Sequence, residues 1–444
     1  MFLSHSRSIS NKRPVSSFGH WQIATALCAT IVEWGTYILI ARTLAPSFFG
    51  TYVFVQWLAT ITVPLIGVGT STLSSRRIAD LQSRETSRSA TGIFYFLWYR
   101  QCHSIILYCL LYASLAYPLF WLFHICQPQL LLLAGLSVLP LFLSSIVGIT
   151  LRSLRRIDLL AILHLFGALS ALLFCLLASQ MNKERIGMFL LAAALAGTLT
   201  LIMAILCVTR LLPLCQALQP GIFLKERLLQ QFKRAPLLFL CDVIVWQCSE
   251  LLLLACWRRA DELAFYAMSA LFSTGVLELA PLLFSLLILP ILCRYFPQRR
   301  YLNAYSTFIR SSCYIALLAL SLCTLAILLS PLLILVLFGA AYLPLVQPLR
   351  ILLISALFGS VATVSLTHLT THEHKKAQLR IGMIAALLNV LLAVPFVVLW
   401  GMIGAALACA CAQTVSSIGS ILLCSWQLKR TSTKQLKNIR RQTS

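Results

Sequence analysis

The 444 residues of the chain are 60% hydrophobic and only 11% charged, and the formal net charge is +23. A soluble domain could not bury so much apolar surface, so the composition excludes a soluble protein and indicates one solvated by a lipid bilayer. The positive charge is divided among several polar connections rather than gathered in one basic module. This distribution excludes a nucleic-acid-binding protein and indicates attraction to anionic lipid headgroups.

Apolar segments long enough to cross a bilayer, about 20 residues each, follow one another along the chain. They predict an all-α polytopic membrane protein with about twelve transmembrane helices. The predicted spans are 19–41, 49–74, 101–124, 129–150, 159–180, 187–209, 236–256, 265–293, 311–337, 351–369, 381–400 and 402–427.

The basic residues lie almost entirely in alternate connections of this map. Of the 35 Lys and Arg residues, 29 fall in the two terminal tails and the connections on the same side as those tails. Cationic residues in short loops stay in the cytoplasm. Both termini are therefore expected to be cytoplasmic, in a multi-pass protein of the cell (inner or plasma) membrane. No cleavable signal is expected, because residues 1–18 are polar.

The fullest polar interruption, 210–235, divides the chain into two halves of six spans. Within it Leu224, Leu228 and Phe232 recur every four residues among charged ones, which predicts an amphipathic helix on the cytoplasmic membrane surface. The expected units are a cytoplasmic tail (1–18), an N-lobe (19–209), this linker (210–235), a C-lobe (236–427) and a basic cytoplasmic tail (428–444).

The two lobes are predicted to be parallel repeats, because six spans return the chain to its starting side. Glu33 and Glu250 lie at the same depth in spans 1 and 7, and Pro64 in span 2 matches Pro281 in span 8. Matched interruptions in two halves are typical of transporters and indicate helix-break hinges near a central site.

Four acidic residues fall within predicted spans, where an ionised group faces a polar cavity or a partner because lipid exposure is costly. They are candidates for lining a cavity and for coupling to Na⁺ or H⁺. The alternative is a neutral carboxyl hydrogen-bonded between helices or, for Asp242, a position near the cytoplasmic surface. Pro281 has no N–H, so the Leu277 carbonyl beside Glu278 is expected to be free for a cation or proton. The four are Glu33, Asp242, Glu250 and Glu278.

Uncharged polar residues also occur in mid-span, and they are expected to bridge helices, with a hydrated cavity as the alternative. His164 is expected to be a packed histidine rather than a titrating one. His372 and His374 lie in a predicted turn without a third ligand, so no metal site is predicted. The bridging candidates are Gln56, Gln247, Asn389 and Gln413.

Basic residues recur at the cytoplasmic ends of spans 2, 4, 8 and 10. Converging there, they could hold a diphosphate through charge-assisted hydrogen bonds, although the orientation signal alone also explains them. The candidates are Arg76, Arg77, Arg152, Arg155, Arg156, Arg294, Lys375 and Lys376.

Two stretches of sequence resemble known membrane proteins. Residues 40–52 (Ile-Ala-Arg-Thr-Leu-Ala-Pro-Ser-Phe-Phe-Gly-Thr-Tyr) and 67–77 resemble the opening of polysaccharide-biosynthesis flippases. Residues 338–342 (Phe-Gly-Ala-Ala-Tyr), Asn389 and 401–408 are similar to the closing third of those proteins. The resemblance covers essentially the whole chain. It implies the O-antigen-type branch of the multidrug/oligosaccharidyl-lipid/polysaccharide exporter superfamily.

This resemblance implies two six-helix lobes around a cavity that opens alternately to each side. The implied activity is translocation of undecaprenyl-diphosphate-linked oligosaccharide from the cytoplasmic to the outer leaflet, for cell-surface polysaccharide assembly. Membrane lipids and glycan-assembly proteins are the expected partners, with no cofactor beyond a coupling Na⁺ or H⁺. Such flippases are expected to have a cationic cavity, whereas the mid-span charges here are acidic. Arg42 and Arg350, near the outer end, could act late in translocation.

Three other functions are compatible with parts of the pattern. An ion-driven multidrug exporter of the same superfamily would use the same carboxylates. A membrane enzyme is not expected, because the outer connections are short and the adjacent Asp261 and Glu262 diverge by about 100° on a helix, a poor acid–base pair. A scaffold for a glycan-assembly complex is the third alternative.

Overall fold

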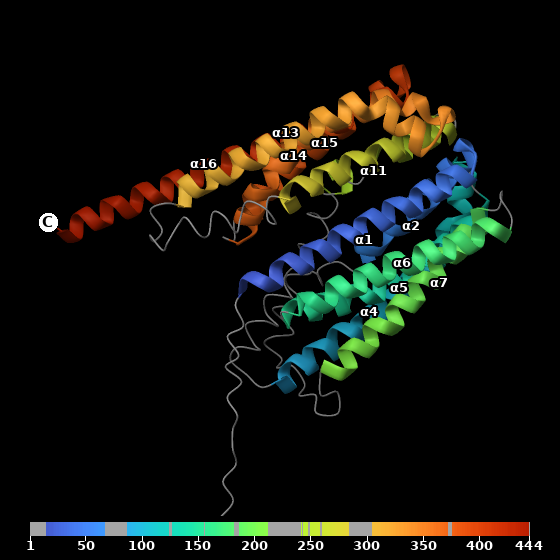
Figure 1. Cartoon of the computed structure of the whole chain (residues 1–444), viewed down its shortest axis with the longest axis horizontal. Helices are drawn as coiled ribbons and strands as arrows, with labels where there is room; N and C mark the ends of the chain where they lie inside the picture. The colour runs from blue at the N-terminus through green and yellow to red at the C-terminus, as the bar shows by residue number, and fades with distance from the viewer. Residues whose placement is uncertain are drawn as a thin grey trace, which may run out of the picture.

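The computed structural model of the chain is built of helices (Figure 1). Within the described residues every regular element is helical, which confirms the predicted all-α class. The structure describes residues 15–66, 87–123, 127–154, 156–181, 186–211, 241, 243–246, 249–257, 260–283, 304–371 and 375–443. The N-lobe contains α1 (Val15–Thr43), α2 (Pro46–Ile66), α4 (Ser87–Phe123), α5 (Pro128–Ser153), α6 (Ile157–Met181) and α7 (Ile186–Leu211). The C-lobe contains α10 (Glu250–Trp257), α11 (Ala260–Leu283), α13 (Ala304–Leu337), η3 (Ala340–Leu345), α14 (Val346–Thr371), α15 (Lys375–Trp400) and α16 (Met402–Thr443).

The chain is a multi-pass membrane protein. In the described part of the chain, nine segments are long and apolar enough to span a bilayer. Their outward side chains are large and apolar, and Leu317, Leu328 and Val336 of α13 are examples that no other helix covers. Lipid tails solvate such a surface as well as a protein core would, so these helices need no polar outer face. The predicted linker 210–235 lies outside the described residues.

The two lobes are parallel repeats, as predicted. In the N-lobe α5 and α6 both pack on α7, and α1 packs on α6. In the C-lobe α14 and α15 both pack on α16, and α10 packs on α15. The helices α2 and α11 are likewise equivalent, because α2 contacts α5 as α11 contacts α14. The same helix order therefore occurs twice.

Close helix packing depends on glycine where backbones approach one another. Gly401 adopts a φ of 59° between α15 and α16, the left-handed conformation that glycine accepts most readily at a helix end. A Cβ atom added to Gly404 would lie 1.9 Å from the carbonyl oxygen of Phe396. The stretch 401–408 thus contains the two glycines that fold α16 back against α15.

The lobes meet at one end and diverge towards the other, as Figure 1 shows. We call the meeting region the converging end; Arg42, Phe49, Ala260, Phe338 and Tyr342 define it. The Arg42 guanidinium of α1 donates to the carbonyl oxygens of Leu337 (2.7 Å) and Val336 at the end of α13. The Tyr342 hydroxyl donates to the Ala41 carbonyl at 3.1 Å.

Aromatic rings and small residues pack together at the converging end. The ring of Tyr342 contacts those of Phe49, Phe265 and Phe338 at centroid distances of 6.4, 5.9 and 5.6 Å. A Cβ atom on Gly50 would lie 2.1 Å from the Ala260 carbonyl oxygen, so only glycine lets α2 approach α11 there. The converging end therefore contains a buried aromatic cluster shared by the two lobes.

Candidate functional site

Three ionisable side chains from both lobes gather between α1, α6 and α11. The Glu33 carboxylate and the His164 imidazole lie 3.6 Å apart, and their side chains are 43% and 56% exposed. Glu278, on α11 of the other lobe, is near enough to interact electrostatically with both. We call Glu33, His164 and Glu278 the acid–histidine cluster.

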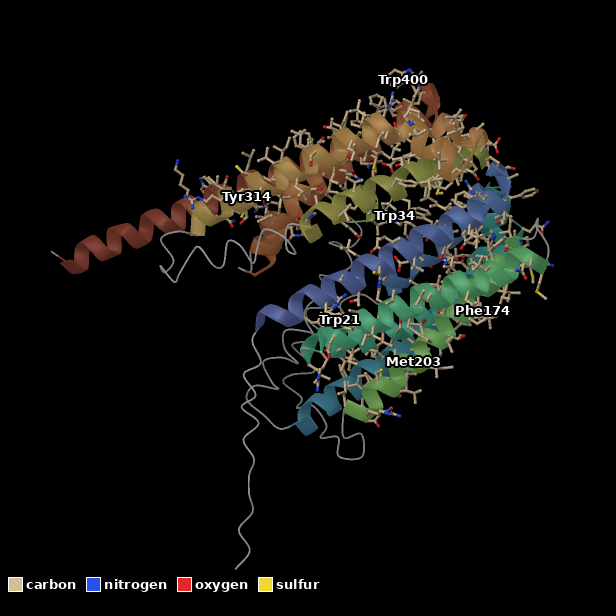
Figure 2. All side chains as sticks on the ribbon, in the orientation of Figure 1. Trp21, Trp34, Phe174, Met203, Tyr314 and Trp400 are labelled. Carbon is tan, nitrogen blue, oxygen red and sulfur yellow. The ribbon has the colours of Figure 1, made fainter. Side chains whose placement is uncertain are left out.

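The acid–histidine cluster lies beside a contact between the lobes. Trp34 packs on Phe272 of α11 with ring centroids 5.3 Å apart, and Figure 2 places Trp34 between α1 and α11. A Cβ atom on Gly275 would lie 1.8 Å from the Trp34 ring. Glu33 precedes Trp34 and Glu278 is about one helical turn beyond Gly275, so both carboxylates lie on the diverging side of this contact.

His164 differs from its sequence-based expectation. It is an exposed residue with a carboxylate partner from α1, rather than a packed histidine. A titratable residue within an apolar span is itself a signal of a polar cavity or partner. The presence of His164 within an apolar span therefore signals such a site, although it does not identify Glu33 as the partner.

Glu250 is enclosed within the C-lobe. Its side chain is 0% exposed, and its two carboxylate oxygens accept hydrogen bonds from the Tyr266 hydroxyl (2.8 Å) and the Asn389 amide (2.7 Å). The Asn389 amide also donates to the Ile244 carbonyl at 3.1 Å, which Ser249 Oγ contacts at 3.0 Å. Glu250 thus ties α10, α11 and α15 together instead of lining the space between the lobes.

The Leu277 carbonyl is not free, and that prediction is wrong. Pro281 lies within α11 and removes one helical donor, but Ser360 Oγ of α14 donates to the Leu277 oxygen at 3.2 Å. A buried serine of the neighbouring helix replaces the missing N–H.

A pocket of about 230 Å³ opens in the C-lobe beside Glu278. Its floor is buried and polar, whereas Thr274 and Glu278 are exposed at its rim. We call it the C-lobe pocket; its lining residues are Trp246, Ser273, Thr274, Leu277, Glu278, Ala356 and Gln413.

The mid-span amides bridge helices as expected. Ser137 of α5 donates to Gln56 Oε1 of α2 at 3.1 Å, and Ser355 of α14 donates to Gln413 Oε1 of α16 at 2.7 Å. Asn389 joins α15 to Glu250, as described above. Gln413 also lines the C-lobe pocket, so bridging and cavity lining coincide there. Gln247 lies outside the described residues.

The structure does not bring the described diphosphate candidates into a pocket. Arg152 is exposed at the end of α5, and Arg156 is exposed and lies 3.8 Å from the Asp158 carboxylate. Pro64 lies in the last turn of α2, while Asp242, Arg76, Arg77 and Arg294 lie outside the described residues, as do the side chains of Arg155, Lys375 and Lys376. Within the described part, no group of three His, Cys, Asp or Glu residues could hold a metal ion.

The two arginines predicted to lie near the outer end make structural contacts. Arg42 bonds to the last carbonyl groups of α13, which have no intrahelical donor and carry the negative end of the helix dipole. Arg350 Nε donates to Ser330 Oγ at 3.3 Å, within the C-lobe. Arg42 therefore joins the lobes, whereas Arg350 joins two helices of one lobe.

Solved transporters share this fold. The lipid II flippase MurJ, in an inward closed conformation, superposes with a TM-score of 0.70 at 12% identity, covering 95% of this chain and 92% of that one. An inward-facing multidrug resistance MATE family transporter of the MOP superfamily gives 0.62 at 14% identity, covering 94% and 96%. The Vibrio cholerae MATE transporter VcmN, as a mutant, gives 0.60 at 15% identity, covering 93% and 96%. No family model and no curated protein matches the sequence. The comparisons show a common fold.

Proposed function

We propose that this chain is a flippase. Its substrate would be an undecaprenyl-diphosphate-linked oligosaccharide, moved from the cytoplasmic to the outer leaflet by alternating access for cell-surface polysaccharide assembly. The observation that carries the proposal is the pair of parallel lobes, which meet at one end and diverge at the other around the acid–histidine cluster. The fold shared with a lipid II flippase and the sequence resemblance at 40–52 and 338–342 support the choice of substrate.

The contacts at the converging end indicate how the lobes would move during alternating access. The distribution of basic residues predicts that this end faces outwards, so the described state would be open to the cytoplasm. Outward opening requires the Arg42 bonds to α13 and the Tyr342 bond to Ala41 to break. These are few polar contacts around an aromatic cluster, so the lobes could separate there while each lobe stays intact. The lipid tail would remain in the bilayer as the sugar crosses between the lobes.

Carboxyl groups would couple this motion to an ion. Glu33 and Glu278 are accessible between the lobes, while Glu250 is enclosed, so H⁺ or Na⁺ exchange at the first two would report directly on the open state. The basic residues at the cytoplasmic helix ends, Arg152 and Arg156 among them, would gather the diphosphate before it enters. Unchanged flipping by a Glu33→Ala/Glu278→Ala double variant would contradict the coupling role.

A second candidate is an ion-coupled multidrug exporter. It is favoured by the acidic charge of Glu33 and Glu278 next to the Trp34 ring, a combination that suits an organic cation. It lacks the support of the sequence resemblance. Neither candidate is an enzyme. A scaffold role would not account for the accessible acid–histidine cluster.

Lipid-linked glycans in a deletion strain distinguish these functions. An impermeant glycan-modifying reagent reports how much undecaprenyl-diphosphate oligosaccharide lies in each leaflet. Accumulation on the cytoplasmic side, reversed by the intact gene, is the expected result. An unchanged distribution would contradict the flippase and favour export of small molecules.

A further inference from the structure

The C-lobe pocket is a cavity lined by Trp246 and by residues of α11, α14 and α16. Its buried floor consists of Ser273, Ala356 and Gln413, and Glu278 and Thr274 stand at its rim. At about 230 Å³ it is smaller than the cavities of about 300–1,000 Å³ that hold drug-sized ligands. It therefore suits one compact group rather than a whole oligosaccharide.

The polar atoms of the pocket are mainly hydrogen-bond acceptors. The hydroxyls of Ser273 and Thr274 both donate to the Ala270 carbonyl, at 3.0 and 2.8 Å, so each can offer a further partner only its oxygen lone pairs. Glu278 adds a carboxylate, which accepts only when ionised. The Gln413 Oε1 atom is occupied by Ser355, so this residue offers N–H groups instead. The complementary ligand is positively charged and rich in donors.

An indole ring completes this environment. Trp246 lines the pocket, and a Cβ atom on Gly359 would lie 3.3 Å from two atoms of its ring and 2.5 Å from Leu277. Glycine at this position of α14 therefore leaves room for the indole. A cation near the face of an indole ring is attracted by its quadrupole, and most strongly where water is excluded.

We propose that the C-lobe pocket binds a primary ammonium group, presented by an amino sugar of the transported glycan. Glu278 would pair with the ammonium, Ser273 and Thr274 would accept its N–H groups, Trp246 would cover it, and Gln413 would donate to a neighbouring hydroxyl. This assignment of substrate class rests on the proposed flippase function. The same chemistry would also admit the amine of a lipid headgroup.

Binding to the purified full-length protein tests the proposal. Saturation-transfer difference NMR would be titrated with glucosamine, glucose and ethanolamine. Glucosamine should bind at least about tenfold more tightly than glucose, because a charge-assisted hydrogen bond contributes roughly 1.5–3 kcal/mol. Weaker binding of ethanolamine would assign the site to amino sugars, and equal binding would assign it to any primary amine. Equal binding of glucose and glucosamine, or binding of neither, would overturn the proposal.

Two pocket variants and one matched control locate the binding. Glu278→Gln keeps the shape of the side chain but removes its charge, and Trp246→Leu removes the indole; each should weaken glucosamine binding about tenfold or more. Glu262→Gln removes a carboxylate from the same helix, about 24 Å away, and should leave binding unchanged. Unchanged binding in a folded Glu278→Gln protein would overturn the proposal even if Trp246→Leu fails to fold.

The leaflet assay tests the flippase function separately from the ammonium site. Glycan flipping by the wild type without glucosamine binding would refute the ammonium site and leave the flippase intact. Glucosamine binding lost in Glu278→Gln, in a protein that flips no glycan, would retain the site and refute the flippase.

Discussion

The two lobes place a carboxyl group on equivalent helix pairs but in opposite surroundings. In the N-lobe, Glu33 of α1 faces His164 of α6 and is 43% exposed between the lobes. In the C-lobe, Glu250 of α10 faces Asn389 of α15 and is 0% exposed. The two pairs therefore occupy equivalent positions in the two lobes but differ in their access to water.

This difference separates two tasks that the sequence alone could not distinguish. A carboxylate open to a cavity can exchange protons or ions and meet a substrate, as a charged group within a membrane protein usually does. A carboxyl group enclosed by hydrogen-bond donors instead holds together the helices that carry those donors. Under the proposed function the N-lobe pair would lie on the transport path, whereas the hydrogen bonds of the C-lobe pair hold its lobe together.

The largest predicted effect is a loss of stability on replacing Glu250, the enclosed carboxyl group. Glu250→Ala removes the acceptor of one hydrogen bond from the Tyr266 hydroxyl and one from the Asn389 amide, and each hydrogen bond lost at a buried site costs roughly 1–3 kcal/mol. We expect the free energy of unfolding to fall by about 2–4 kcal/mol, measured by thermal unfolding in detergent. Glu33→Ala, the matched change in the N-lobe, should leave the unfolding temperature nearly unchanged. Equal losses in both variants would refute the distinction between the pairs.

The next effect concerns the contact beside the acid–histidine cluster. Gly275→Ala would place a Cβ atom 1.8 Å from the Trp34 ring, so the lobes must separate or the ring must move. Such overpacking costs about 1–3 kcal/mol, and we expect a wider distance between spin labels on α1 and α11. Gly35→Ala is the control, since a Cβ atom there meets nothing within 4 Å. Adding Trp34→Ala to Gly275→Ala should restore the distance, and a persistent change would refute the steric account.

A smaller effect is expected at the converging end. Arg42→Ala removes the guanidinium that joins α1 to the end of α13, an exposed contact worth about 1 kcal/mol. The population of molecules open at this end should rise about fivefold, detected as faster labelling of a cysteine placed beside Tyr342. Arg350→Ala removes a bond within the C-lobe and should not change the labelling rate. Faster labelling in both variants would indicate general loosening rather than loss of a contact between lobes.

The sequence predicted the fold more fully than the pairings within it. Segment length and composition gave the helices, and matched residues such as Pro64 and Pro281 gave the parallel repeat. The partners of Glu250, of the Leu277 carbonyl and of His164 were not predictable, because they depend on how each helix is rotated. A span that is apolar on all sides carries no amphipathic stripe to fix that rotation, since lipid and protein interior are equally apolar. Glycines such as Gly275 mark close approach, but the sequence does not say to which helix.

Flipping by the purified protein tests the central claim most directly. The protein would be reconstituted into liposomes containing undecaprenyl-diphosphate oligosaccharide, and an impermeant oxidant would report the fraction of glycan exposed outside. The account predicts that the wild type transfers glycan between leaflets under an imposed H⁺ or Na⁺ gradient, and that Glu33→Ala slows the transfer about tenfold or more, equivalent to roughly 1.4 kcal/mol. No transfer by the wild type, with or without a gradient, would contradict it.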